Sequence, residues 1–78
     1  MNTITIIKST FAAKVWFSDL MMHILLDDGR ELAVPIDWFP KLRDASDKER
    51  KNFRFIGGGE GIHWEELDED ILVEALLF

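Results

Sequence analysis

The sequence predicts an α+β protein whose antiparallel sheet contains three N-terminal strands and one C-terminal strand, with two short helices between them (βββααβ). Three observations support this order. Residues 3–36 are rich in β-branched and aromatic side chains with partial period-two alternation. Residues 37–53 carry helix-start signals, and residues 70–78 form an apolar run. At 78 residues and 47% hydrophobic content, we expect a single domain spanning residues 1–78.

The first half is expected to form an antiparallel meander. Gly29 within Asp27–Arg30 can adopt a positive φ at little cost, which suits the turn of a hairpin. Pro35 has no amide hydrogen and is expected at a sheet edge or strand end. The expected strands cover residues 3–8 with 11–18 as one long or broken strand, then residues 21–26 and residues 31–36.

Two short helices are expected in the middle of the chain. Asp37 is a candidate cap for the first, with Pro40 in its first turn. Ser46 and Glu49 have the spacing of a capping box, which predicts a second helix from Asp47 to about Phe53. Residues 70–78 then read as a final strand, and their continuous apolar character favours a central position, buried on both faces of the sheet.

The glycine-rich stretch at residues 57–61 is interpreted as a turn. A phosphate-binding loop would require Lys and Ser or Thr after the last glycine, but Ile62 and His63 follow Gly61. The dinucleotide-binding fingerprint also fails, because Trp64 occupies the position of its third glycine. Glycine's access to left-handed backbone conformations is sufficient to explain the stretch.

A metal site has only weak support in the sequence. His63 with Glu65 and Glu66 could form one, but the helical spacing of zinc proteases is absent and there are no cysteines. The acids from Asp68 onward do not match a calcium loop, since the sixth position is valine instead of glycine. We therefore expect a hydrogen-bonded His63, no cofactor and no enzymatic activity.

Charge is distributed unevenly along the chain. The net charge is −6; residues 41–54 carry +3, whereas residues 60–78 contain seven acids and no base. A net acidic chain is a poor non-specific binder of nucleic acid, so direct nucleic-acid binding is not expected. The N-terminus lacks a signal-peptide pattern and no apolar stretch has membrane-spanning length, which predicts a cytoplasmic protein without a membrane association.

Several strings resemble one family of small bacterial proteins. They are Pro35–Leu42, the helix after Ser46, Gly61–Trp64 and Leu67–Ile71. The pattern resembles domain-of-unknown-function family 2442 and extends over almost the whole chain. The resemblance implies an α+β fold without a known activity, and some members lie beside another small gene in toxin–antitoxin-like arrangements. Others carry a C-terminal helix-turn-helix, which is absent here, so DNA recognition by that route is not expected.

These observations favour a non-enzymatic protein-interaction module, such as an antitoxin-like or regulatory partner of a small protein encoded nearby. The opposed charges of the two segments suit electrostatically steered association, and exposed tryptophans are typical interface anchors. Sheet extension at an edge strand could also give a homodimer. The alternatives are an acidic inhibitor that mimics nucleic acid, as anti-CRISPR-type proteins do, and a metal-dependent enzyme using His63 and nearby carboxylates. The candidate interaction residues are Trp38, Arg50, Arg54, His63, Trp64, Glu65, Glu66, Asp68, Glu69 and Asp70, with Trp16 as a further tryptophan.

Overall fold

The computed structural model describes residues 10–77 and shows an α+β architecture with two antiparallel three-stranded sheets. Strand order is β1-β2-β3 in the first sheet and β4-β5-β6 in the second. The elements in chain order are β1 (Ala12–Ser18), β2 (Met21–Leu26), β3 (Glu31–Pro35), the 3-10 helix η1 (Ile36–Trp38), α1 (Pro40–Arg43), α2 (Asp47–Lys51), β4 (Arg54–Ile56), β5 (Gly61–Trp64), β6 (Glu69–Leu72) and the 3-10 helix η2 (Val73–Leu77).

The first sheet confirms the predicted meander. The expected strand at residues 21–26 is β2, and the second hairpin turns at Gly29, whose φ is +92°. Pro35 is the last residue of β3, an edge strand, as its missing amide hydrogen predicts. The third strand is one residue shorter than expected, because Ile36 begins η1. The strand predicted at residues 3–8 lies outside the described residues.

The second sheet corrects the predicted architecture. One C-terminal strand was expected to join the first sheet, but three short strands form a separate sheet. The strand expected at residues 70–78 spans only Glu69–Leu72, and it lies at an edge instead of the centre. Residues 73–77 form η2, whose inward residues Val73, Leu76 and Leu77 follow helical spacing.

The helices agree in part with the prediction. Ser46 Oγ accepts a hydrogen bond from the Glu49 amide at 3.1 Å, and Glu49 Oε1 accepts one from the Ser46 amide at 2.9 Å, which confirms the capping box. The helix ends at Lys51 instead of about Phe53. Pro40 occupies the first turn of α1 as expected, but Asp37 caps neither helix: it lies inside η1, and neither η1 nor α1 has a side-chain cap.

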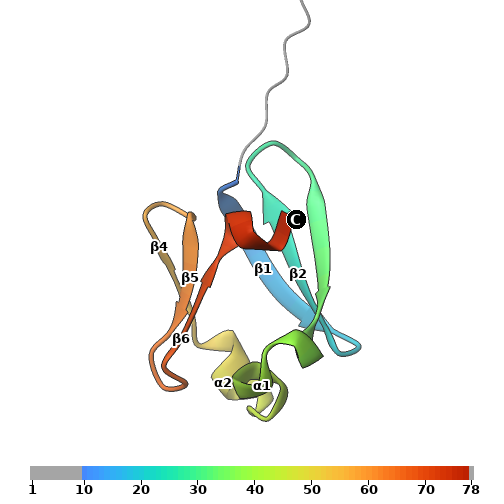
Figure 1. Ribbon diagram of the computed structural model, residues 1–78, viewed down its shortest axis with the longest axis vertical. Coiled ribbons are helices and arrows are strands. Elements are labelled where there is room, and N and C mark those ends of the chain that lie inside the picture. Colours follow the sequence, from blue (N-terminus) through green and yellow to red (C-terminus); the bar gives the residue numbers. More distant parts are fainter. Residues whose placement is uncertain (1–9, 78) are drawn as a thin grey trace, which may run out of the picture.

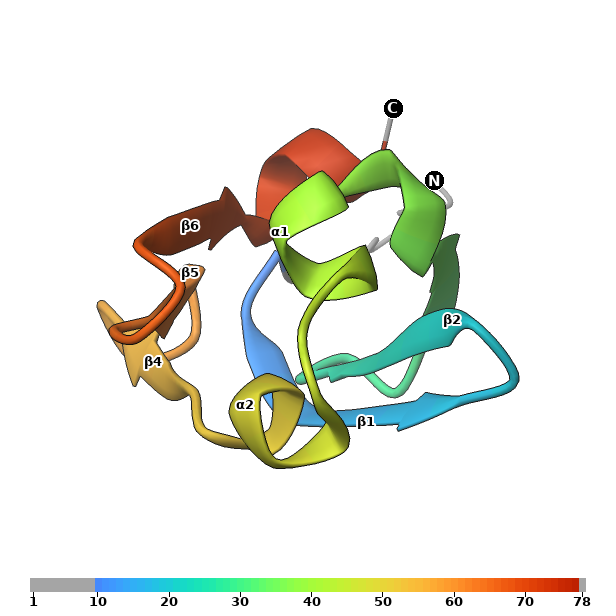
Figure 2. The ribbon, with the colours of Figure 1, turned by 90° about the horizontal axis from the view of Figure 1, so that it is seen from below.

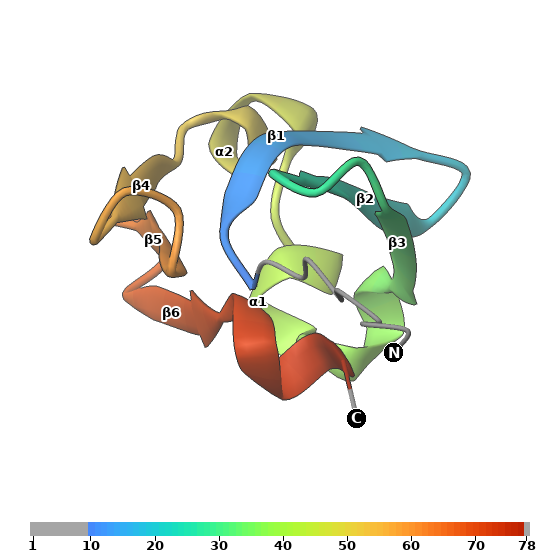
Figure 3. The same cartoon turned by 90° about the horizontal axis from the view of Figure 1, so that it is seen from above.

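The two sheets share one buried cluster. Figure 1 shows the sheets side by side with α1 and α2 across one end. In the end-on views of Figures 2 and 3 the sheets lie around a common interior, and η2, in red, covers one side. The cluster draws residues from both sheets and from η1, α1 and η2: Ala12, Val15, Met22, Ile24, Leu26, Val34, Ile36, Leu42, Ile62, Trp64, Ile71 and Val73. Within residues 10–77, no helix is long and apolar enough to cross a membrane.

The glycine turn joins β4 to β5 and contacts the first sheet. Gly57, Gly58 and Gly59 have φ values of +61°, +74° and +113°, which confirms their interpretation as a left-handed turn. The Ala12 amide donates a hydrogen bond to the Gly59 carbonyl at 2.8 Å. A Cβ atom at Gly59 would lie 2.3 Å from the Ala12 carbonyl oxygen. Only glycine therefore allows this close approach between the turn and β1.

Candidate interaction site

The outward face of the second sheet gathers four of the charged residues that the sequence singled out. Arg54 lies opposite His63 in the β4–β5 pairing, and His63 lies opposite Asp70 in the β5–β6 pairing. Directly opposed residues of adjacent strands point to the same face, so these three side chains form one row across the sheet. Glu65 follows β5 immediately and its carboxylate reaches back to His63.

These residues form a continuous ionic network. His63 Nδ1 hydrogen-bonds to Asp70, and His63 Nε2 hydrogen-bonds to Glu65 Oε2 at 2.6 Å. The same Glu65 oxygen lies 3.7 Å from the Arg54 guanidinium. The His63 side chain is 16% exposed, whereas the three charged partners are mostly exposed. The network therefore presents charge to solvent around a largely covered imidazole.

The geometry requires a protonated imidazole. Ionised carboxylates only accept hydrogen bonds, and both ring nitrogens donate only in the imidazolium form. The hydrogen bonds to Asp70 first and Glu65 second raise the pKa of His63 above its ordinary value of 6.5. Because both nitrogens are engaged, His63 offers no lone pair to a metal ion in this arrangement. It acts as the centre of a charged surface cluster.

An apolar row lies beside this network on the same face. Ile56 lies opposite Gly61, and Gly61 lies opposite Leu72. Both large side chains are exposed, Ile56 at 43% and Leu72 at 49%. Since Gly61 has no side chain, a depression of about 320 Å³ lies at this place, with apolar walls and with Glu60 and Asp70 in its lining. The face thus combines an apolar hollow with an ionic border.

One of the candidate interaction residues lies in the interior, and a second is held by hydrogen bonds within the fold. Trp64 has no exposed area, packs against Phe53 and donates its indole N–H to the Arg50 carbonyl at 2.9 Å. Arg50 donates to the carbonyls of Leu42 at 2.7 Å and Arg43 at 2.8 Å. These contacts tie α2 to α1 and to β5. Trp64 is therefore corrected from a surface contact to a core residue, and Arg50 makes structural contacts between α1 and α2.

The other two tryptophans differ in exposure. Trp38 in η1 is 61% exposed and remains a candidate anchor, but it lies in a different element from the ionic network. Trp16 stacks on His23 with ring centroids 5.3 Å apart, and Lys14 Nζ lies 5.4 Å from the Trp16 ring centroid. Trp16 is thus covered on the outer surface of the first sheet.

The remaining candidate acids are dispersed along the turns and β6. Glu66 accepts a hydrogen bond from Asn52 at 2.7 Å, the Asp68 carbonyl accepts one from Lys41 at 2.8 Å, and Glu69 accepts one from the Asp70 amide at 3.0 Å. Among residues 10–77, no three His, Asp or Glu side chains are arranged to hold a metal ion. The structure therefore unites only part of the acidic segment, namely Glu65 and Asp70.

Ile56 and Leu72 were not among the surface residues predicted from the sequence. Leu72 was assigned to a strand buried on both faces, and residues 54–56 and 61–64 were not recognised as strands. The usable signal is the alternation of Gly61 and His63 with buried Ile62 and Trp64, which places the first two on the outer face.

The fold and this face define a small α+β protein with a mixed apolar and ionic surface. The chain belongs to the family described as protein of unknown function (DUF2442), which matches residues 12–78 and confirms the resemblance found in the sequence. It is also similar to a protein of unknown function from Rhodospirillum rubrum ATCC 11170, with 30% sequence identity and a TM-score of 0.74 over 86% of this chain and 83% of the other. The comparison with curated proteins gave no match.

Proposed function

We propose that this chain is a non-enzymatic protein-interaction module that binds another small protein, in an antitoxin-like or regulatory role, through the outward face of β4, β5 and β6. The observation that carries the proposal is the exposed Ile56–Gly61–Leu72 row beside the ionic network centred on His63. The partner is expected to be encoded nearby.

The composition of the face supports this role. Protein interfaces combine a desolvated apolar centre with a polar rim, and the two isoleucine and leucine side chains with the adjacent ion pairs supply both. Exposed apolar side chains that lie close together on one face of a sheet, such as Ile56 and Leu72, lower solubility unless something covers them. The Glu60 carboxylate in the lining of the hollow favours a partner whose contact surface is apolar with basic residues at its border.

The test is a comparison of capture efficiencies with matched variants. The tagged chain is expressed in its native cells, and co-purified proteins are identified and quantified by mass spectrometry. Leu72→Asp should abolish recovery of the partner, because it places a charge in the apolar centre of the interface. Ala33→Asp is the control, since Ala33 is also exposed but lies in β3 of the first sheet.

Equal recovery of the partner with the two aspartate variants would contradict the proposed face. If no co-purified protein is recovered less with Leu72→Asp than with the wild-type chain, the proposed function is contradicted. The acidic-mimic alternative has a separate test. If a variant with amides in place of Glu65, Glu66, Asp68, Glu69 and Asp70 still inhibits a nucleic-acid-binding machine, the alternative is wrong.

A further inference from the structure

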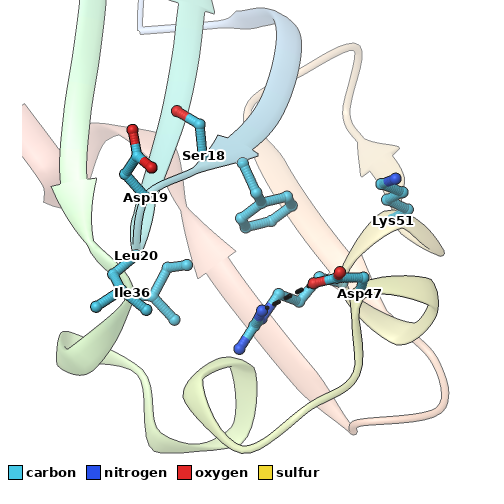
Figure 4. Close-up of a pocket in the computed structure, with 8 residues that line it drawn as sticks. Ser18, Asp19, Leu20, Ile36, Asp47 and Lys51 are labelled. Carbon is cyan, nitrogen blue, oxygen red and sulfur yellow. Dashed lines mark hydrogen bonds and ion pairs between the residues drawn. The ribbon is translucent and has the colours of Figure 1, made fainter.

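A second hollow lies between the β1–β2 turn and α2 (Figure 4). It measures about 400 Å³. Phe17 and Ile36 supply apolar surface, and Leu20 stands at the turn. Arg50 and Asp47 also line it, but they are paired with each other at 3.2 Å. This hollow shares no lining residue with the face of the second sheet.

Leu20 is unfavourable in this turn for two reasons, its backbone conformation and its exposure to solvent. Its φ is +66°, and Asp19 before it has φ +49°, so both residues of the tight turn adopt left-handed conformations. Such turns favour Asn-Gly or Asp-Gly, because a side chain at the second position is strained there. Leu20 is also 71% exposed. The Leu20 carbonyl accepts a hydrogen bond from the Ile36 amide at 2.9 Å, which holds the turn beside the hollow.

Two unpaired charges of opposite sign flank the hollow. Asp19 comes from the β1–β2 turn and Lys51 from the end of α2, and Figure 4 shows them on different sides of the hollow. Within the described part of the chain, neither side chain has a hydrogen bond or an ion pair. The surface therefore carries an apolar projection, Leu20, next to a hollow with apolar surface at Phe17 and Ile36, and an acid across from a base.

We propose that this surface binds the same surface of a second copy of the chain about a two-fold axis. A two-fold interface requires a surface that is complementary to itself, and each feature here has its complement on the same patch. Leu20 of each copy enters the hollow of the other, and Asp19 of each copy faces Lys51 of the other. The exposed and strained leucine is thereby explained as an interface residue.

The first experiment measures oligomeric state by sedimentation equilibrium over a range of concentrations. The wild-type chain should form a dimer whose fraction rises with concentration. Asp19→Lys and Lys51→Asp should each raise the dissociation constant by more than about tenfold, because each places like charges across the axis. A mixture of the two single variants should form a heterodimer, and the double variant D19K/K51D should recover the homodimer.

The second experiment separates the interface role of Leu20 from a structural one. Leu20→Gly should relieve the strained turn and therefore raise the stability of the monomer, measured by urea unfolding at a concentration where both proteins are monomeric. The same variant should lose the dimer. A structural role for Leu20 predicts the opposite, a less stable monomer, and would overturn the proposal.

The remaining outcomes are also decisive. A wild-type chain that stays monomeric at its highest soluble concentration overturns the proposal. So does a dimer that persists in Leu20→Gly, or folded single charge variants that fail to associate when mixed. Leu72→Asp should leave the dimer intact, and this result distinguishes a failure of this proposal from a failure of the partner-binding face.

Discussion

At the scale of single residues, His63 is the side chain whose charge state is most clearly coupled to folding. The folded state raises its pKa, with the Asp70 hydrogen bond as the largest cause and the Glu65 hydrogen bond next. A raised pKa means that the folded state binds the proton more tightly than the unfolded state. The resulting stabilisation is fully present below the unfolded pKa of about 6.5. It is lost as the pH rises through the folded value.

We therefore predict that the free energy of unfolding decreases as the pH rises from about 6 through the raised folded pKa of His63. Urea unfolding at a series of pH values measures this change. His63→Gln is the control, since it removes the titrating group and should flatten this part of the profile, and His23 is present in both proteins. An NMR titration that places the His63 midpoint at or below 6.5 would contradict the prediction.

Gly59 is the second residue that matters individually, because its position leaves no room for a side chain. A Cβ atom there would contact the Ala12 carbonyl oxygen at 2.3 Å, whereas nothing lies within 4 Å of a Cβ atom at Gly58. Both glycines have positive φ. Gly58→Ala should therefore cost about 1 kcal/mol for the left-handed backbone. Gly59→Ala should cost at least about 2 kcal/mol more, because the two sheets must move apart at their junction.

Chemical denaturation of the two alanine variants compares these costs directly. Equal losses of stability would show that the close approach between Gly59 and Ala12 contributes nothing beyond backbone strain.

At the scale of secondary-structure elements, α2 depends on its cap and on its connections. With only the five residues Asp47–Lys51 it is too short to be stable alone. Ser46→Ala removes the acceptor for the Glu49 amide and should reduce stability by about 1 kcal/mol. Ser46→Asp preserves a side-chain acceptor at the same position and should recover most of this loss in thermal unfolding.

If the aspartate variant were as unstable as the alanine variant, the cap would not be the source of the stabilisation. The rescue matters because a general effect of substitution at this turn would lower both variants equally.

The elements that the sequence predicted well are those specified by local chemistry. Gly29 in its hairpin and Ser46 in its capping box require only neighbouring residues, and both predictions are confirmed. The strand β4 has three residues, and its strand character comes from pairing with β5, which no local pattern shows. The apolar run at the C-terminus was misassigned because a short apolar segment is compatible with a strand or a helix. Its inward residues Val73, Leu76 and Leu77 carried the helical signal.

The candidate site was predictable only in part, for the same reason. The sequence singled out three charged residues of one segment, His63, Glu65 and Asp70. Their contacts depend on the β5–β6 register, which places His63 opposite Asp70. Trp64 was selected for its residue type, which does not distinguish a buried indole from an exposed one. Alternation within β5 separates His63 from Trp64, but only once that segment is recognised as a strand.

At the scale of the whole molecule, the two sheets depend on one buried cluster. Ile24 of β2 and Ile62 of β5 both belong to it and have no exposed area. The glycine turn adds a backbone hydrogen bond between Ala12 and Gly59, and Val73 donates to the Glu60 carbonyl at 3.0 Å. Neither three-stranded sheet retains a covered apolar face without the other, so we expect them to unfold together.

This expectation can be tested by changing one sheet and observing the other. Ile24→Val removes a buried methylene group from β2 and should lower the free energy of unfolding by about 1 kcal/mol. Hydrogen exchange measured by NMR should then show the same decrease for the slowest amides of both β2 and β5, because both exchange through a common global opening. A decrease confined to β1, β2 and β3 would mean that the sheets unfold independently. The shared core would then contribute packing without cooperativity.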